Sequence, residues 1–298
     1  MADPNQRLRV VPTPDELRLW ADELIPGERD IWYWDDSPLD PGPTGCQVMP
    51  REAYRSDPIY RDIRYANAYC EWLMPAEATQ VIVSDAAWIG TLSTTDRHHV
   101  LRKQIDLKRG LVFPAEWFGE QQELLQPHTV ADQVVLGQSA WASLPTGIQQ
   151  RALLAEQRQC DEVECYPVPD GTPAHVRAIA NTFSPHEGTN CFAITAYGAT
   201  AAPHLLATWL TVSPIDLVAP LGYREVPDRE PMANDIVIFE LGGRVIHAAW
   251  SLGDDRFLNK NAQSRFAPIR IVDWAMLDAE WLAEWPDTSW SLYRRDVP

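Results

Sequence analysis

The fold of the C-terminal half is decided by residues 235–259, which read DIVIFELGGRVIHAAWSLGDDRFLN. Three apolar runs in this stretch are separated by Gly242-Gly243 and by Gly253-Asp254-Asp255, which are turn sequences between antiparallel strands. Residues 269–271 predict a fourth strand. Helical segments precede these strands in the chain, and helices followed by an antiparallel meander are typical of the α+β class.

A histidine lies inside the second apolar run. Strand alternation places His247 on one face with Val245 and Ala249, and it places Ile246 and Ala248 on the other face. A polar ring without a partner is costly among apolar neighbours. We therefore expect His247 to have a partner and a chemical role.

An imidazole that acts as a base needs an acceptor on its second ring nitrogen, and a side-chain amide can supply it. If residues 253–255 form a three-residue loop, Asn259 falls opposite Ala249 on the face of His247, and Asn261 falls directly opposite His247. A two-residue loop would turn Asn259 to the other face. The residues alone leave open whether Asn259 or Asn261 orients the ring.

A cysteine stands where a helix should begin. Thr189 or Asn190 can cap a helix that continues through an apolar segment, which places Cys191 in its first turn. The positive end of a helix and a nearby imidazolium both lower a thiol pKa. A lone buried cysteine is more often a small hydrophobe. Together and in this order, however, Cys191, His247 and Asn259 indicate thiol-dependent hydrolysis.

The same residues resemble the NlpC-type branch of the papain-like cysteine peptidases. That family has an Asp-led apolar strand, a His strand, a Gly-Asp turn and a third polar residue twelve positions after the histidine. The likeness covers roughly residues 172–275. It implies a papain-like (NlpC-type) fold with a helix-borne cysteine and an antiparallel sheet. It also implies that Cys191 is the nucleophile, His247 the general base and then acid, and Asn259 the orienting residue. The backbone amide of Cys191 would contribute to the oxyanion hole.

The chain departs from that family beside the nucleophile. It has Asn190-Cys191-Phe192 where the family usually has Asp-Cys-Ser, whose Asp helps to bind a free substrate amine. Binding of a wall-peptide amine terminus is therefore not implied. The third position is often His in the family but is Asn here, as in papain. Three further residues are candidates for substrate binding at the cleft: His186, Asn190 and Asn261.

Three functions are compatible with this pattern. The first is a cysteine amidase or peptidase that cleaves an amide bond in a peptide-like or peptidoglycan-type substrate through an acyl-thioester on Cys191. The second is an acyl- or amide-transferase that resolves the same thioester with an amine or alcohol. The third is a papain-like binding protein without turnover. The chemistry of the first two needs no cofactor and no metal, and we expect neither.

The pattern predicts two domains. Residues 150–298 form the papain-like domain, and residues 1–149 form a mixed α/β domain of unknown role, either a cap over the cleft or an integral part of one larger domain. In the first half, Trp32-Tyr33-Trp34 is more typical of a core strand than of a sugar platform. Near the C-terminus, Trp274, Trp281 and Trp285 recur at helical spacing, and we expect them to pack against the sheet, outside the site.

Composition narrows the partners and the location. The net charge of −17 over 298 residues argues against nucleic acid and against an anionic membrane as partners. The partner that the resemblance implies is a small peptide-like or amide substrate. The five cysteines are an odd number without regular spacing, as in proteins of a reducing compartment. The N-terminus has no apolar signal core, so we expect a cytoplasmic protein, with export by a non-Sec route left open. The sequence does not indicate an oligomeric state.

Overall fold

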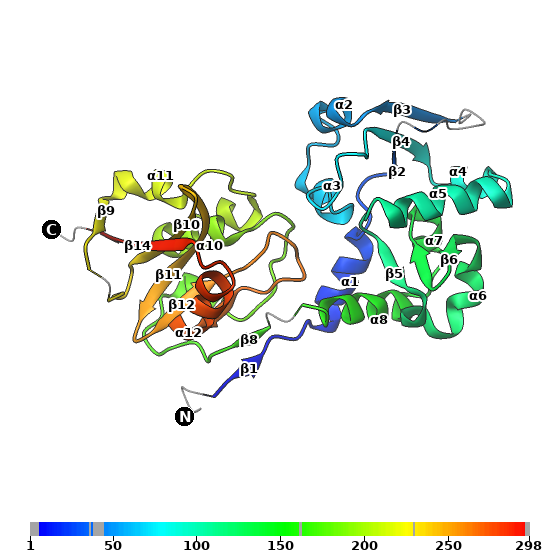
Figure 1. Cartoon of the computed structure of the whole chain (residues 1–298). Helices are drawn as coiled ribbons and strands as arrows, with labels where there is room; N and C mark the ends of the chain where they lie inside the picture. The colour runs from blue at the N-terminus through cyan, green and yellow to red at the C-terminus, as the bar shows by residue number, and fades with distance from the viewer. Residues whose placement is uncertain (1–5, 36, 38–44, 161–162, 229, 296–298) are drawn as a thin grey trace. The chain divides into compact units, whose positions relative to one another are not determined.

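The structure, a computed structural model, describes residues 6–35, 37, 45–160, 163–228 and 230–295 (Figure 1). Its contacts divide the chain into one unit of residues 1–16 and 157–298 and a second unit of Leu17–Glu156. The sequence predicted a division at residue 150, with all of residues 1–149 in the N-terminal domain. Strand β1 (Leu8–Arg9) instead belongs with the C-terminal half, because it pairs with β8 (Glu164–Cys165). A two-residue strand carries no alternation that a sequence pattern could reveal.

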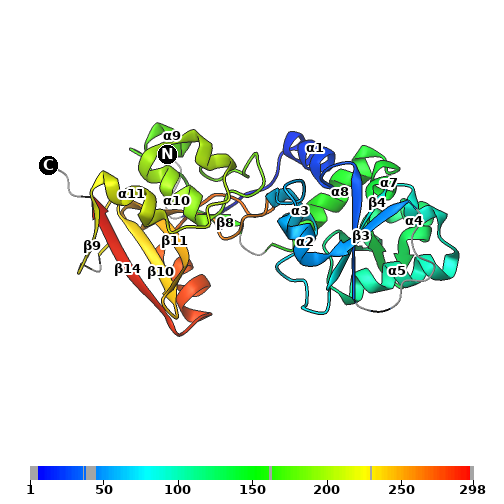
Figure 2. The same ribbon diagram turned by 90° about the horizontal axis from the view of Figure 1, so that it is seen from above.

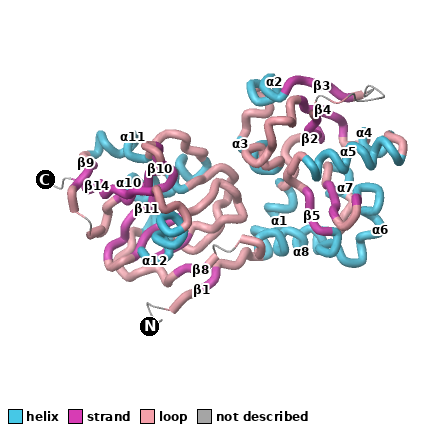
Figure 3. Tube along the Cα trace, viewed as in Figure 1, coloured by secondary structure: helices cyan, strands magenta, loops and turns pink. Residues whose placement is uncertain are grey.

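The unit of Leu17–Glu156 contains two small antiparallel sheets, β2-β4-β3 and β5-β7-β6, among helices (Figure 3). The strand Trp32-Tyr33-Trp34 is buried, as its sequence predicts. The elements are α1 (Pro14–Glu23), β2 (Arg29–Trp34), β3 (Cys46–Pro50), α2 (Arg51–Ser56), α3 (Ile63–Ala68), β4 (Gln80–Asp85), α4 (Trp88–Thr91), α5 (Thr94–Asp106), β5 (Val112–Pro114), η1 (Ala115–Gln121), α6 (Gln122–Leu125), η2 (Gln126–His128), β6 (Thr129–Val130), β7 (Gln133–Val135), α7 (Gln138–Ala142) and α8 (Thr146–Gln157).

The other unit is built on a sheet in which six described strands follow the order β13-β12-β11-β10-β14-β9, with every neighbouring pair antiparallel. The prediction of an α+β chain is confirmed. The remaining elements are α9 (Ala174–Arg177), α10 (Cys191–Thr200), η3 (Pro203–Ala207), α11 (Pro214–Val218), η4 (Ala219–Leu221), β9 (Tyr223–Val226), β10 (Ile236–Leu241), β11 (Arg244–Gly253), β12 (Arg256–Asn259), β13 (Arg270–Val272), α12 (Trp274–Leu277), η5 (Asp278–Ala283) and β14 (Thr288–Arg295).

The sheet is covered on both faces. Helices α9, α10 and α11 lie over one face (Figure 2), where Ile194 packs with Ala248 and Trp250. On the opposite face α12 and η5 cover a second apolar cluster that includes Phe239 and Ala249. The candidate nucleophile therefore comes from a helix on one face, and the covering segment on the other face contains the C-terminal tryptophans.

The turn between β11 and β12 differs from the predicted three-residue loop. Asp254 and Asp255 form a two-residue turn, both with positive φ, and Gly253 pairs with Arg256. A bulge between Ser251 and Gly253 then adds one residue to β11. The extra residue restores the register of a three-residue loop, so Asn259 still lies on the face of His247.

A second bulge lies in the pairing of β10 with β11, between Phe239 and Glu240. It breaks the alternation that the sequence predicted for the start of β11. Val245 packs with the cluster under α10, whereas Ile246 packs on the face of Phe239. The faces predicted for these two residues were therefore wrong, because strict alternation fails at a bulge.

The close packing of α10 against β11 gives a first prediction. A Cβ at Gly198 would lie 2.7 Å from the Trp250 ring, too close for van der Waals contact. Gly198→Ala should therefore lower the free energy of unfolding by about 1–3 kcal/mol, as overpacked cores do. Gly147→Ala is the control, because its Cβ would meet nothing within 4 Å. Thermal unfolding of both variants measures the difference, and equal melting temperatures would contradict the packing described.

Candidate active site

The Cys191 thiol sits at the start of α10, as predicted. Asn190 caps the helix: its Oδ1 accepts a hydrogen bond from the Ala193 amide at 3.1 Å. The backbone N–H groups of Cys191, Phe192 and Ala248 surround the sulfur and lower its pKa. This is the electropositive environment that the first turn of a helix provides for a thiolate.

Burial outweighs these amides. The Cys191 side chain is only slightly exposed, and burial raises the pKa of its thiol to about 11, although the Lys260 ammonium acts in the opposite direction. In the arrangement seen here the thiol is therefore protonated at neutral pH.

Lys260 holds the loop that follows β12. Its buried ammonium donates to the backbone carbonyl oxygens of Ala262, Ser264 and Ala267 at 2.6–2.8 Å. Burial lowers the pKa of Lys260 to about 7, whereas the charge of Glu187 raises it. The lysine thus fixes the backbone of this loop beside the nucleophile.

The same loop is tied to the segment that leads into Cys191. Arg265 forms a buried ion pair with Glu187, and the Gly188 amide donates to the Gln263 carbonyl oxygen at 3.0 Å. No sequence signal pointed to this contact, since the two segments lie about 75 residues apart and carry no shared pattern.

His247 is fully buried in β11. Its Nε2 lies 2.7 Å from Oδ1 of Asn259. The Trp281 indole from η5 stacks on the imidazole, with the ring centroids 4.0 Å apart and the planes at 12°. Phe239 contacts the ring from β10. The structure therefore places Asn259, not Asn261, on the ring and covers the pair with a tryptophan.

The protonation of His247 follows from this burial. Burial lowers the pKa of the imidazole to about 3, with a small contribution in the same direction from the Arg270 charge and an opposing one from the Asn259 hydrogen bond. The ring is neutral at pH 7. Its Nδ1 is buried and has no hydrogen-bond partner among the described residues.

Cys191 and His247 meet at one peptide unit. The sulfur lies at the backbone N–H of Ala248, the residue that directly follows His247. The imidazole ring of His247 contacts Phe239 and Trp281, whereas α10 packs on the face of the sheet that holds Ala248. Within the described part of the chain no hydrogen bond joins the sulfur to the ring. The structure thus brings the sulfur to the peptide unit that follows His247, and both the thiol and the ring are neutral.

The other three predicted residues have different surroundings. Asn261 lies behind Asn259: its Oδ1 accepts from Asn259 Nδ2 at 2.6 Å, and its own Nδ2 donates to Glu280 at 2.7 Å. Both polar side-chain atoms of Asn190 make hydrogen bonds to the backbone: Oδ1 accepts from the Ala193 amide, and Nδ2 donates to the Leu210 carbonyl oxygen. His186 is exposed on the loop before Cys191. Of the three, His186 alone presents its side chain to solvent at the nucleophile loop.

Sequence reasoning missed Trp281, Glu280 and Lys260 as parts of the site. The tryptophan was expected to pack on the sheet, which it does, but its ring covers His247. Glu280 was missed because a glutamate three residues after a short helix is not a sequence signal for a site. A buried Lys260 is contrary to the usual exposure of lysine.

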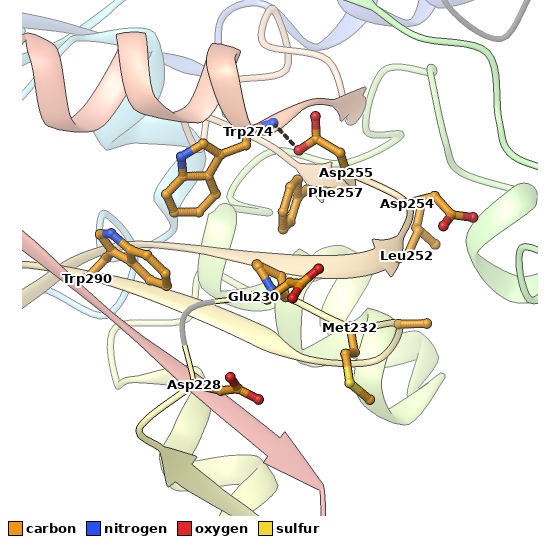
Figure 4. Close-up of a pocket in the computed structure, with 12 residues that line it drawn as sticks. Asp228, Glu230, Met232, Leu252, Asp254, Asp255, Phe257, Trp274 and Trp290 are labelled. Atoms are coloured by element: carbon orange, nitrogen blue, oxygen red, sulfur yellow. Dashed lines mark hydrogen bonds between the residues drawn. The ribbon is translucent and has the colours of Figure 1, made fainter.

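A cavity of about 770 Å³ lies elsewhere in this unit (Figure 4). Trp274 and Trp290 line one part of it, and Asp228, Glu230 and Met232 line another. Its described lining includes none of the six predicted site residues, so we assign it no part in the chemistry. In the described residues, no group of three or more His, Cys, Asp or Glu side chains is placed to hold a metal ion. No helix there is both long and apolar enough to cross a membrane.

In comparisons with known proteins, no family model, no curated protein and no solved structure matches this chain.

The stacking of Trp281 gives a second prediction. The folded-state pKa of His247, about 3, lies below the ordinary value of 6.5. Between pH 3 and pH 6.5 the imidazole is therefore protonated in the unfolded chain but not in the folded protein. This contribution to stability is complete above about pH 6.5 and is lost as pH falls toward 3. Trp281→Ala should admit water, raise the pKa of His247 toward 6.5 and weaken this acid dependence.

NMR titration of the His247 ring, together with urea unfolding at pH 5 and pH 7, measures both effects. Trp285→Ala is the control, since Trp285 is an exposed tryptophan of the same segment. A His247 pKa that stays unchanged in Trp281→Ala would show that the indole does not shield the ring.

Proposed function

We propose that this chain is a cysteine-dependent amide hydrolase with a papain-like, NlpC-type catalytic unit. The observation that carries the proposal is the state of His247. Its Nε2 faces the acceptor oxygen of Asn259, and its buried Nδ1 has no hydrogen-bond partner in the described part of the chain. The peptide unit that follows His247 contacts the Cys191 sulfur. A buried acceptor without a hydrogen bond costs about 1–3 kcal/mol, so its retention supports a chemical use.

The chemistry follows from these positions. Nδ1 of His247 accepts the thiol proton as the sulfur of Cys191 attacks the substrate carbonyl, and the backbone N–H of Cys191 donates to the developing oxyanion. The imidazolium then returns the proton to the leaving amine, which departs and leaves an acyl-thioester. Water, deprotonated by the same Nδ1, cleaves the thioester, and the thiol is restored.

The proton moves during the attack and not before it. Burial raises the pKa of Cys191 to about 11 and lowers that of His247 to about 3, so the free protein holds a neutral thiol and a neutral ring. For this proton transfer the sulfur must move to Nδ1 as substrate binds. General-base assistance from a neutral imidazole then replaces a preformed ion pair.

The substrate that we propose is a small peptide-like amide, with peptidoglycan-type peptides in the same class. An acyl- or amide-transferase would use the same thioester and differ only in the acceptor. We place the protein in the cytoplasm, where thiols stay reduced. The net charge of −17 favours a neutral or cationic substrate over an anionic one.

A second candidate is a papain-like binding protein without turnover. It is favoured by one observation: the neutral pair is not hydrogen-bonded in the arrangement described. In such a protein Cys191 would be a buried small side chain and Nδ1 an unused acceptor. The two candidates differ in whether a covalent adduct forms at Cys191.

Intact-protein mass spectrometry with a panel of acyl-dipeptide p-nitroanilides separates the candidates. The hydrolase should form an acyl adduct on Cys191 and release nitroaniline. Cys191→Ala should abolish both, and His247→Gln should slow acylation by about 10²–10⁴-fold, the usual contribution of a general base. Cys165→Ala is the control, because burial raises the pKa of that thiol to about 11 as well. Activity that persists in Cys191→Ala would contradict the assignment of Cys191 as the nucleophile. No adduct with any member of the panel would favour the binding protein.

An added amine distinguishes hydrolysis from transfer. With methylamine present, a transferase should yield the N-methylamide of the acyl group in place of the free acid.

A further inference from the structure

We infer that Glu280 fixes which nitrogen of His247 carries the proton, acting through two asparagine side chains. The inference rests on the proposed function, for which it supplies a positioning residue 33 places along the chain from the histidine. It is drawn from the hydrogen bonds that run from η5 to the ring.

We call the hydrogen-bonded series Glu280, Asn261, Asn259 and His247 the relay. It starts at the Glu280 carboxylate, which is held in place. Arg270, which is almost completely buried, donates from Nη2 to both oxygens of Glu280 at 3.0 and 3.2 Å. The guanidinium also donates to the Glu164 carbonyl oxygen. An arginine can only donate and a carboxylate can only accept, so the direction of hydrogen bonding at this end is set.

That direction propagates through the amides. Since Glu280 only accepts, Asn261 must turn its Nδ2 toward it, at 2.7 Å, and present Oδ1 to Asn259. Asn259 must then donate from Nδ2, at 2.6 Å, and present its own Oδ1 to the ring. An oxygen at 2.7 Å from Nε2 requires a proton on Nε2. His247 is thereby held as the Nε2–H tautomer, with the lone pair on Nδ1.

The opposite direction would disable the proposed base. If Asn259 presented Nδ2 to the ring, Nε2 would have to accept, and Nδ1 would carry the proton. Nδ1 could then not take a proton from Cys191. A wrong tautomer in an otherwise intact site lowers turnover by several orders of magnitude in serine hydrolases.

The two amides also keep charge away from the ring. A carboxylate directly on Nε2 would stabilise the imidazolium and raise the pKa of His247. Through Asn261 and Asn259, Glu280 transmits direction without placing its charge beside the ring, which remains neutral. The hydrogen bonds of this partly buried chain reinforce one another, because each polarises the next at low dielectric.

Glu280→Gln tests the relay with an isosteric change. The oxygen of the new carboxamide must face Arg270, so its amide nitrogen faces Asn261. Both asparagines should turn over, and His247 should convert to the Nδ1–H tautomer. The protein labelled with ¹⁵N-histidine shows this directly, since protonated and unprotonated ring nitrogens have distinct shifts; His247→Gln assigns the signal among the seven histidines.

A second substitution should reverse the effect. In Glu280→Gln, Asn261→Asp the carboxylate moves one step along the relay, accepts both from the carboxamide introduced at position 280 and from Asn259, and restores the Nε2–H tautomer. Glu284→Gln, which changes an exposed glutamate of the same segment, is the control that should leave the tautomer unchanged. The inference is overturned if Glu280→Gln keeps the Nε2–H form.

A further variant and an activity measurement complete the test. Should Glu280→Gln fail to fold, Asn261→Leu cuts the relay without touching the Arg270 ion pair and should give both tautomers; the Nε2–H form alone would refute the relay. Acylation of Cys191 by p-nitroanilides should fall by about 10²–10⁴-fold in Glu280→Gln and recover in the double variant. Because the tautomer is measured without substrate, a protein that shows the switch but never forms an acyl adduct would refute the hydrolase and leave the relay intact.

Discussion

The hydrogen bond of 2.7 Å between His247 Nε2 and Asn259 Oδ1 is the interaction on which the site depends. It exists because β11 and β12 pair in one register. In that register Trp250 lies opposite Leu258, so the next residue of β12, Asn259, shares a face with the histidine. A shift of one residue would move Asn259 to the face of α10 and leave the ring without its acceptor. The bulge that follows Ser251 is thus a structural requirement of the site, since the two-residue turn alone would give the wrong face.

Burying polar groups under a sheet is costly unless they are satisfied. Here Asn259, Asn261, Glu280 and Arg270 satisfy one another in a continuous chain, while Trp281 excludes water from the ring at its end. Three nitrogens of this region are buried without a partner among the described residues: Arg270 Nε, Trp281 Nε1 and His247 Nδ1. The first two can only donate, whereas Nδ1 of the Nε2–H tautomer carries a lone pair. In the function that we propose, this lone pair is the base that accepts the thiol proton of Cys191.

The sequence was informative where a local pattern exists and silent where contacts are distant. Gly and Asp turns, apolar runs and a capping Asn190 were enough to predict the four strands between residues 236 and 272 and the start of α10. The face of Asn259 was predicted only for a three-residue loop, and it holds because the bulge restores that register. The loop length and the faces of Val245 and Ile246 were wrong, since a bulge leaves no mark in composition. Trp281 was expected on the sheet but outside the site, because helical spacing identifies a buried face and not which ring a side chain will cover.

The neutral thiol and ring constrain how the proposed papain-like site can work in this chain. Low exposure favours an uncharged thiol and ring over an ion pair, and the helix amides and Lys260 do not overcome it. If the pair were already ionised, Asn259 would need only to solvate a positive ring, and the tautomer of the neutral form would not matter. A neutral ring can accept the thiol proton only through a free lone pair on Nδ1, so the direction of the relay from Glu280 becomes decisive. The burial that opposes thiolate formation is therefore also what makes a distant carboxylate control the base.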